Sequence, residues 1–443
     1  MEINLYEHQK QALELTKDRN RVAYYLDMGL GKTFVGSEKM AELNSKLNIL
    51  ICQKSKIEDW EEHFKKFYPG YMIFNLTDKK GMESFKATSQ LAHKTSIIGI
   101  INYELTFRRN SLLYLKDFTL ILDESSMIQN ETAKRTKFIL KMKPENVILL
   151  SGTPTSGKYE KLYSQLKLLG WNITKDLYYK QYIDFEMEDV NGFKIPKIIG
   201  YKNVERLKRK LKMNGAVFMK SDEVFSLPEM IENIISVKAT EEYSEFMKNS
   251  IITVTTEGAK FIDDSDFYGK DITPRKELVG DTTLTKVLYS RMLCGAYSYK
   301  KVQMLKDLID STEDRLIIFY NFNNELEVIK KIAKHRERPL SIVNGKERHL
   351  AAYENSEHSI TAIQYQAGAM GLNLQKANKI IYFTLPLSSE LFEQSKKRVH
   401  RIGQNKSCFY YYLIVKDSIE EKIFETLKLR KDYTDTLFKK YEE

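Results

Sequence analysis

The stretch Val22-Ala23-Tyr24-Tyr25-Leu26-Asp27-Met28-Gly29-Leu30-Gly31-Lys32-Thr33 decides the fold class of this chain. Its apolar first part, 22–26, predicts a buried parallel strand, and residues 33 to about 43 predict a helix. Gly29 and Gly31 in the turn between them allow backbone N–H groups to surround an anion. The N-terminus of the following helix adds partial positive charge. The stretch therefore predicts a phosphate-binding strand–turn–helix unit.

The residues of this turn, Gly29, Leu30, Gly31, Lys32 and Thr33, are candidates for nucleotide binding. Lys32 can reach β- and γ-phosphates, and the Thr33 hydroxyl can bind Mg²⁺. The full phosphate-loop pattern has a glycine five residues before Gly31, where this chain has Leu26. A plain glycine turn at a strand–helix junction is therefore the alternative for this stretch taken alone.

Strand-like and helix-like segments alternate beyond this unit. Strands are predicted at 47–52, 95–101, 118–122 and 146–150, and a helix at 55–67. This alternation predicts a parallel sheet with right-handed crossovers, in which ligands bind at the carboxyl ends of the strands.

Asp123 and Glu124 follow one of these strands at that edge. An acid that ends a buried strand is costly without a partner, and Mg²⁺ held by Thr33 would be such a partner. We therefore expect Asp123 to hold the metal, directly or through water, and Glu124 to orient and activate the attacking water. A helix cap or turn carboxylate is the simpler alternative.

The second half of the chain repeats the alternation without a phosphate loop. Strands are predicted at 315–320, 340–343, 360–365, 379–383 and 408–415, and helices at 323–334, 388–399 and from about 418. We therefore expect two α/β domains, 1–235 and 236–443, with insertions at about 155–230 and 240–310 and a site shared between them. Arg398 and Arg401, three residues apart on a predicted helix, are candidates to stabilise charge on a γ-phosphoryl group. A solvated basic helix end is the alternative.

Composition limits the class of protein. The 443 residues are 42% hydrophobic and 29% charged, which is typical of a soluble globular protein. The net charge of +10 suits a polyanionic partner such as nucleic acid. No signal-peptide pattern and no apolar run of membrane-helix length is present, so we expect no membrane partner. Three scattered cysteines predict a reducing compartment, the cytoplasm, with the nucleus left open.

Taken together, the motifs resemble those of the Swi/Snf-type, remodeller-like DNA translocases of helicase superfamily two. Leu5–Gln9 resembles the adenine-reading segment of that family. Asp123-Glu124-Ser125-Ser126 resembles its D-E-A-H position, and Ser151-Gly152-Thr153-Pro154 matches its S/T-G-T-P motif. The fifth and last motifs are matched by 364–368 with 371–378, and by Gln394 with 398–404.

The resemblance implies two RecA-like lobes that hydrolyse ATP with Mg²⁺ in the cleft between them while tracking DNA. Gln9 would read the adenine. Lys32, Glu124, Arg398 and Arg401 would be catalytic, and Thr33 and Asp123 would hold the metal. By position, the candidate contacts with DNA phosphates are Lys54, Ser55, Asn102, Thr153 and Gly368. The serine at 126 replaces the histidine of the family pattern, which leaves open how ATP and DNA are coupled.

Three activities besides translocation along duplex DNA fit parts of this pattern. A strand-separating helicase would need a rigid wedge. No aromatic-tipped hairpin is evident between the fifth motif and Arg398, although the segments 155–230 and 240–310 have room for one. A non-hydrolysing DNA-binding scaffold would not need the intact charged set of Lys32, Asp123, Glu124, Arg398 and Arg401. A P-loop kinase would not need an arginine-bearing second lobe. The recruiting protein is not indicated by the sequence.

Overall fold

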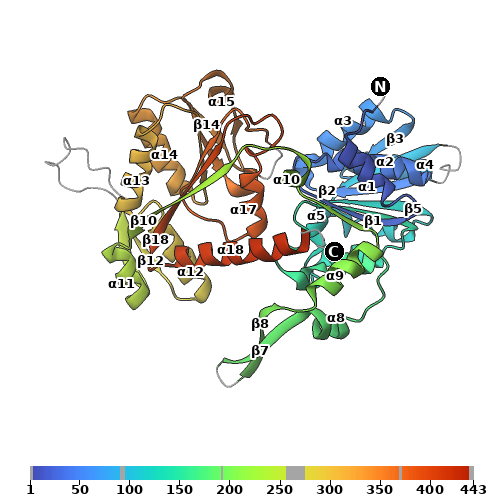
Figure 1. Cartoon of the computed structure of the whole chain (residues 1–443), viewed down its shortest axis with the longest axis horizontal. Coiled ribbons are helices and arrows are strands. Elements are labelled where there is room, and N and C mark those ends of the chain that lie inside the picture. The colour runs from blue at the N-terminus through green and yellow to red at the C-terminus, as the bar shows by residue number, and fades with distance from the viewer. Residues whose placement is uncertain (1–2, 90–94, 191–192, 256–274, 369–371, 439–443) are drawn as a thin grey trace. The chain divides into compact units, whose positions relative to one another are not determined.

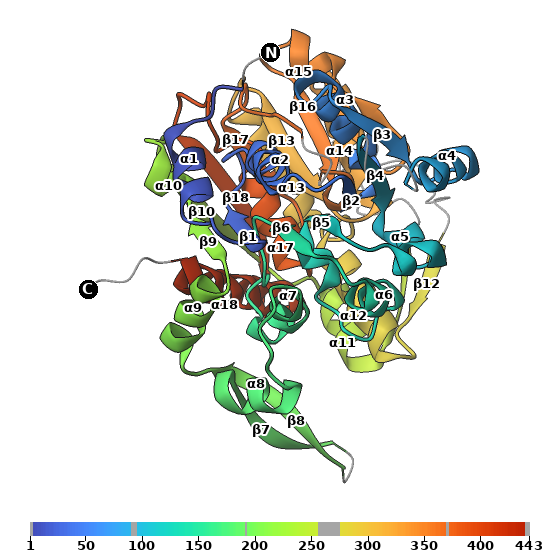
Figure 2. The same cartoon turned by 90° about the vertical axis from the view of Figure 1, so that its right-hand side faces the viewer.

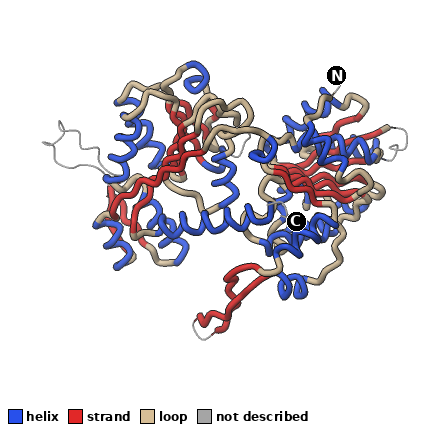
Figure 3. Tube along the Cα trace, in the orientation of Figure 1, coloured by secondary structure: helices blue, strands red, loops and turns tan. Residues whose placement is uncertain are grey.

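The computed structural model describes residues 3–89, 95–190, 193–255, 275–368 and 372–438. The chain divides into two compact units, Met1–Ser226 with Asp432–Glu443, and Leu227–Lys431. Each unit is built on one twisted sheet flanked by helices (Figures 1 and 3). The expected α/β class with two RecA-like, parallel-sheet lobes is confirmed.

The first unit contains a seven-stranded sheet in the order β3-β4-β2-β5-β6-β1-β9, and every neighbouring pair is parallel. Apolar residues occupy both faces of its central strands, as parallel sheets covered by helices require. The strands are β1 (Arg21–Leu26), β2 (Leu47–Cys52), β3 (Tyr71–Asn75), β4 (Ser96–Asn102), β5 (Phe118–Asp123), β6 (Asn146–Leu150) and β9 (Ala216–Met219).

Successive residues along the strands of this sheet point to opposite faces, so alternate residues belong to two different hydrophobic clusters. Tyr24 faces one cluster with side chains from α1, α2 and α3, and Tyr25 faces the other with side chains from α4 to α9. The helices are α1 (Glu7–Glu14), α2 (Lys32–Leu43), α3 (Ile57–Phe67), α4 (Lys79–Ser89), α5 (Tyr103–Thr106), α6 (Lys134–Lys141), α7 (Tyr163–Leu168), α8 (Lys175–Tyr182), α9 (Val204–Met213) and α10 (Ser221–Val224).

The expected insertion at 155–230 is in part integral to the first unit. Strand β9 pairs with β1 and so completes the sheet, and α7 packs against it. The same segment forms an antiparallel hairpin of β7 (Ile183–Val190) and β8 (Phe193–Tyr201), which extends away from the sheet in both views (Figures 1 and 2).

The second unit contains a seven-stranded sheet in the order β10-β18-β17-β13-β16-β14-β15, parallel except for the β14–β15 pair. A separate two-stranded antiparallel sheet pairs β11 (Ile251–Thr255) with β12 (Arg275–Val279). The strands of the sheet are β10 (Met230–Lys238), β13 (Leu316–Tyr320), β14 (Leu340–Val343), β15 (Arg348–His349), β16 (Ile360–Gln364), β17 (Lys379–Tyr382) and β18 (Cys408–Lys416).

The helices of this unit are α11 (Glu241–Asn249), α12 (Thr283–Cys294), α13 (Tyr299–Asp310), α14 (Asn323–His335), α15 (Ala351–Asn355), α16 (Tyr365–Gly368), α17 (Ser389–Lys396) and most of α18 (Ile419–Phe438). Helix α13 lies in the expected insertion at 240–310, yet its buried side chains Val302, Leu305 and Ile309 belong to the core on this sheet. The acidic stretch Asp263-Asp264-Ser265-Asp266, whose composition predicts a loop, lies outside the described residues.

The division of the chain differs from the expected boundary at 235. It falls between Ser226 and Leu227, because β10 crosses position 235 and pairs along its whole length with β18. Residues from Asp432 belong to the first unit, where the ring of Tyr433 packs edge-on against that of Tyr201 at 4.7 Å. Among the described residues, no helix has the length and apolarity to cross a membrane.

Candidate nucleotide-binding and DNA-binding site

The carboxyl edge of the first sheet collects the candidate residues of that unit. The phosphate loop follows β1, Lys54 and Ser55 follow β2, and Asn102 ends β4. Asp123 ends β5 and Glu124 follows it, and the turn 151–154 follows β6. Since these five parallel strands are neighbours in one sheet, the topology brings together residues that lie far apart in the sequence.

The phosphate loop has the backbone conformation that its glycines predict. Gly29 and Gly31 have φ angles of +86° and +72°, a region that strains other residues, and α2 begins immediately afterwards at Lys32. The ammonium group of Lys32 donates to the carbonyl oxygen of Leu26 at 3.0 Å. A β-carbon on Gly152 would lie 3.3 Å from this ammonium, so Lys32 lies against the turn after β6.

Gln9 packs on the phosphate loop. Its Nε2 donates to the Leu30 carbonyl at 3.1 Å, and its Oε1 accepts from the Tyr6 backbone N–H at 2.9 Å. A β-carbon on Gly31 would lie only 2.2 Å from Gln9 Nε2, so a side chain at this position would displace the Gln9 amide. The role of Gln9 toward adenine stays a prediction, since both ends of its amide bind protein atoms here.

Asp123 is held by an indole that the sequence alone did not single out. Burial raises the pKa of its carboxyl, and the hydrogen bond from Trp60 Nε1, 2.9 Å long, opposes that shift. A half-buried carboxylate of this kind fits a divalent cation, which would offset its cost of ionisation. Together with Thr33 it would provide two protein ligands, as Mg²⁺ commonly has beside phosphates. The described part of the chain holds no cluster of three or more His, Cys, Asp or Glu side chains suited to a metal.

Glu124 occupies a strained backbone position with φ of +54°. That conformation costs a non-glycine residue about 1 kcal/mol or more, so surrounding contacts must maintain it. The Tyr103 hydroxyl donates to the carbonyls of Asp123 and Glu124 at 2.9 and 3.2 Å. Ser151 Oγ donates to Glu124 Oε2 at 3.2 Å, which ties the turn after β6 directly to the expected water-activating carboxylate.

The candidate DNA contacts differ in exposure. Lys54 and Ser55 are exposed on a short 3₁₀ turn, Lys54–Lys56. Asn102 and Thr153 are 3% and 8% exposed, and neither Asn102 Oδ1 nor Thr153 Oγ1 has a hydrogen-bond partner among the described residues. Gly368 ends α16, and the three residues that follow it, 369–371, lie outside the described residues.

The arginines of the second unit lie in a turn, not on a helix as expected. Helix α17 ends at Lys396, and Arg398 and Arg401 follow it. Arg401 Nη1 donates to Asn373 Oδ1, and the Arg398 carbonyl accepts from the Leu374 N–H at 3.1 Å. The last motif therefore binds the fifth motif within the second unit, which positions both arginines without a continuous helix.

The fold and the phosphate loop place this chain in the class of P-loop proteins with two parallel-sheet units. The chain belongs to the family described as SNF2-related domain, whose model matches residues 8–295. The model of the helicase conserved C-terminal domain matches residues 300–403. The resemblance inferred from the motifs is thereby confirmed.

Two curated relatives illustrate the family. The chain is 24% identical, over 92% of its length, to the SWI/SNF-related matrix-associated actin-dependent regulator of chromatin subfamily A member 1 of Mus musculus. It is 23% identical, also over 92%, to the ISWI chromatin-remodeling complex ATPase ISW2 of Saccharomyces cerevisiae. The chain spans 40% and 38% of these proteins. A solved Sulfolobus solfataricus SWI2/SNF2 ATPase core in complex with dsDNA matches 98% of this chain and 92% of its own, with 20% identity and a TM-score of 0.43.

Proposed function

We propose that this chain is a DNA-dependent ATPase that hydrolyses ATP with Mg²⁺ and moves along duplex DNA without sequence preference. The observation that carries the proposal is the arrangement of charged and polar side chains at the carboxyl edge of the first sheet. There Lys32 lies against the turn 151–154, and Ser151 of that turn donates to Glu124. Membership of the SNF2-related family supports the same activity.

Each residue has a separate role in the proposal. Lys32 and the backbone of Gly29–Lys32 would hold the β- and γ-phosphates, and Thr33 and Asp123 would hold Mg²⁺. Glu124 would accept a proton from the attacking water. Arg398 and Arg401 would approach the γ-phosphoryl group from the second unit and stabilise the charge that develops there. Bound ATP supplies a phosphoanhydride whose hydrolysis releases the free energy for movement.

DNA binding would rely on phosphate contacts and not on base edges, since a motor must step over any sequence. Lys54, Ser55, Asn102, Thr153 and Gly368 are the proposed contacts. Affinity for duplexes of different sequence should be equal, and log K should fall with log salt by about 0.9 for each phosphate neutralised. A strong preference for one sequence among matched duplexes would contradict the proposal.

Steady-state ATP hydrolysis tests the activity. The protein is assayed alone and with duplex DNA, single-stranded DNA or RNA of equal length. The proposal predicts the highest rate with duplex DNA and a background rate for Lys32→Ala under every condition. The scaffold alternative predicts no hydrolysis with any nucleic acid, and the kinase alternative predicts turnover only with a phosphoryl acceptor.

A further inference from the structure

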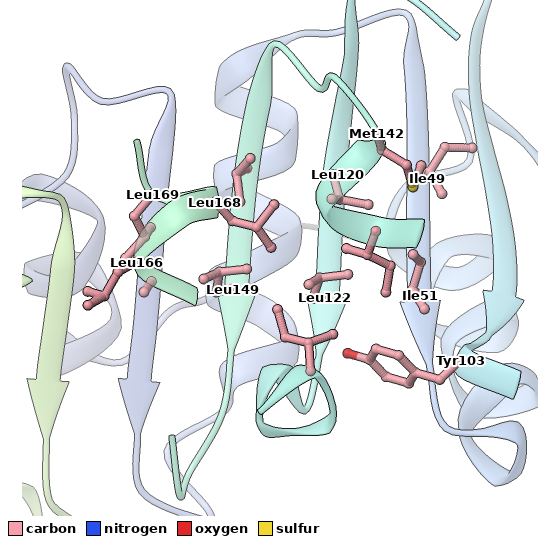
Figure 4. Packing of buried hydrophobic residues seen from close by; sticks show 14 of the residues in the cluster. Ile49, Ile51, Tyr103, Leu120, Leu122, Met142, Leu149, Leu166, Leu168 and Leu169 are labelled. Carbon is pink, nitrogen blue, oxygen red and sulfur yellow. The ribbon is translucent and has the colours of Figure 1, made fainter. Parts of the chain in front are cut away.

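Gln165 is a fully buried polar side chain in helix α7, beside the apolar cluster on one face of the first sheet. Its neighbours Leu162 and Leu166 are also fully buried. Figure 4 shows Leu166, Leu168 and Leu169 packed near Leu149 of β6. An amide in such surroundings is costly unless its polar atoms are hydrogen-bonded.

Its hydrogen bonds join three separate segments. Gln165 Oε1 accepts from the Tyr25 hydroxyl at 3.0 Å and from Ser125 Oγ at 2.8 Å. Gln165 Nε2 donates to the Pro154 carbonyl at 2.8 Å. The amide thus bridges the turn that follows Glu124 and the turn that contains Thr153.

The opposite side of the Glu124 turn is held by Tyr103. Figure 4 shows the Tyr103 ring with its oxygen directed at the turn beyond Leu122, in agreement with its bonds to the Asp123 and Glu124 carbonyls. Tyr103 follows Asn102, another candidate DNA contact. The strained turn at Glu124 therefore lies between two hydrogen-bonded supports, each beside a residue expected to contact DNA.

We propose that Gln165 is a positioning residue that transmits DNA contact at Thr153 to Glu124. The inference rests on the proposed function. A DNA phosphate at Thr153 would fix the turn 151–154, and with it the Pro154 carbonyl. The Gln165 amide, held at one end by that carbonyl, would then fix Ser125 and the backbone conformation of Glu124. Ser151 makes the second link, directly to the Glu124 carboxylate.

The test compares ATP hydrolysis by the full chain with and without duplex DNA for wild type, Gln165→Met and Tyr25→Phe. Methionine keeps the volume and length of the side chain and removes all three hydrogen bonds. We expect Gln165→Met to lower the ratio of DNA-stimulated to basal kcat about tenfold, the size of a typical coupling. Its KM for ATP should stay within about twofold of wild type, since Lys32 and Thr33 are untouched.

Tyr25→Phe is the matched control. It removes one buried hydrogen bond from the same Gln165 oxygen but leaves the bridge between the two turns. We expect a lower melting temperature and an unchanged stimulation ratio. If Gln165 serves only stability, the two variants will behave alike in both readouts, and the proposal is then overturned.

Ser125→Ala provides a second route should Gln165→Met not fold. It cuts the bridge from the other end and should lower the stimulation ratio in the same direction. The double variant Gln165→Met with Ser125→Ala should have the same stimulation ratio as the more strongly affected single variant, because both substitutions break the same bridge between the two turns. A wild-type protein that DNA does not stimulate overturns the proposed function and this inference together. A stimulated wild type with unaltered stimulation in Gln165→Met and Ser125→Ala overturns this inference alone.

Discussion

The indole Nε1 of Trp60 lies 2.9 Å from Oδ2 of Asp123 and donates a hydrogen bond to it. Trp60 is 3% exposed and stacks on Phe64 in the same helix, α3, which begins two residues after Ser55. The helix that starts beside the candidate DNA contacts Lys54 and Ser55 therefore also fixes the candidate metal-binding carboxylate. The indole orients Asp123 in the way that outer groups commonly orient metal ligands.

Trp60→Phe is predicted to weaken Mg²⁺ binding while the packing is kept. The phenyl ring fills most of the same space but has no donor, so the Asp123 carboxylate loses its orientation. We expect the Mg²⁺ concentration for half-maximal ATP hydrolysis to rise about tenfold. Tyr68→Phe is the control, since it removes a hydrogen bond to Glu38 from the same aromatic cluster without touching Asp123 or Thr33. An unchanged Mg²⁺ requirement in Trp60→Phe would show that the bond has no such role.

Glu124→Gln is predicted to bind ATP normally and hydrolyse it slowly. The amide keeps the shape of the side chain and can still accept from Ser151 Oγ, but it is too weak a base to take the proton of water. Lys32→Ala is the comparison, because it should lose nucleotide affinity as well as turnover. Nucleotide titration and single-turnover hydrolysis separate the two effects. Equal loss of binding and turnover in Glu124→Gln would assign that residue a different role.

The sequence predicts the phosphate loop, the positions of most strands along the chain and the placement of Asp123 and Glu124, because each depends on a local pattern. Apolar runs followed by glycine or by acids are visible without knowledge of packing. Strand β9 is short, and only its pairing with β1 makes it part of the sheet. Trp60, Tyr103 and Gln165 could not be assigned from sequence, since their bonds to the Asp123–Glu124 turn come from elements 20 to 63 residues away.

Arg401→Ala is predicted to lose roughly 10³-fold in turnover, by analogy with other arginine fingers. The guanidinium would act on charge that develops during the reaction, so the affinity for ATP should change little. Arg398→Ala should behave similarly. Steady-state kcat together with the affinity for a fluorescent ATP analogue measures both effects. Survival of turnover in both variants would exclude an active site shared between the two units.

Glu325→Gln is predicted to stabilise the second unit at alkaline pH. Glu325 is fully buried and accepts from the N–H groups of Asn321 and Phe322 and from the Thr384 hydroxyl. Burial raises the pKa of its carboxyl to about 7. Because the folded-state pKa exceeds the unfolded one, its stabilising contribution is complete below about pH 4.5 and is lost as the pH rises through about 7.

The free energy of unfolding should therefore fall by up to about 3 kcal/mol between those pH values in wild type and remain flat in Glu325→Gln. Hydrogen exchange of the β13 amides at several pH values, corrected for intrinsic rates, measures this. Glu327→Gln, an exposed change in the same helix, should leave the wild-type slope unaltered. The same slope in Glu325→Gln as in wild type would show that this carboxyl does not titrate as described.

The hairpin β7–β8 is the element that would act as the wedge if the protein were a strand-separating helicase. Phe193 is 74% exposed at the start of β8, and Phe185 and Met187 are also exposed. The hairpin lies in the segment 155–230, where the sequence has room for a wedge. Replacing residues 184–200 by a Gly-Ser linker removes it, since only Ile183 and Tyr201 of the paired strands would remain. ATP hydrolysis and movement on duplex DNA should persist in this variant.

Displacement of a third strand from a DNA triplex tests the central claim most directly, since a protein that moves along an intact duplex must eject that strand. The assay uses wild type, the hairpin-deleted chain and Glu124→Gln, with a forked duplex of the same sequence in parallel. We predict ATP-dependent triplex displacement by the first two proteins, none by Glu124→Gln, and no separation of the fork. Efficient unwinding of the fork by wild type, or no triplex displacement despite DNA-stimulated hydrolysis, would contradict the account.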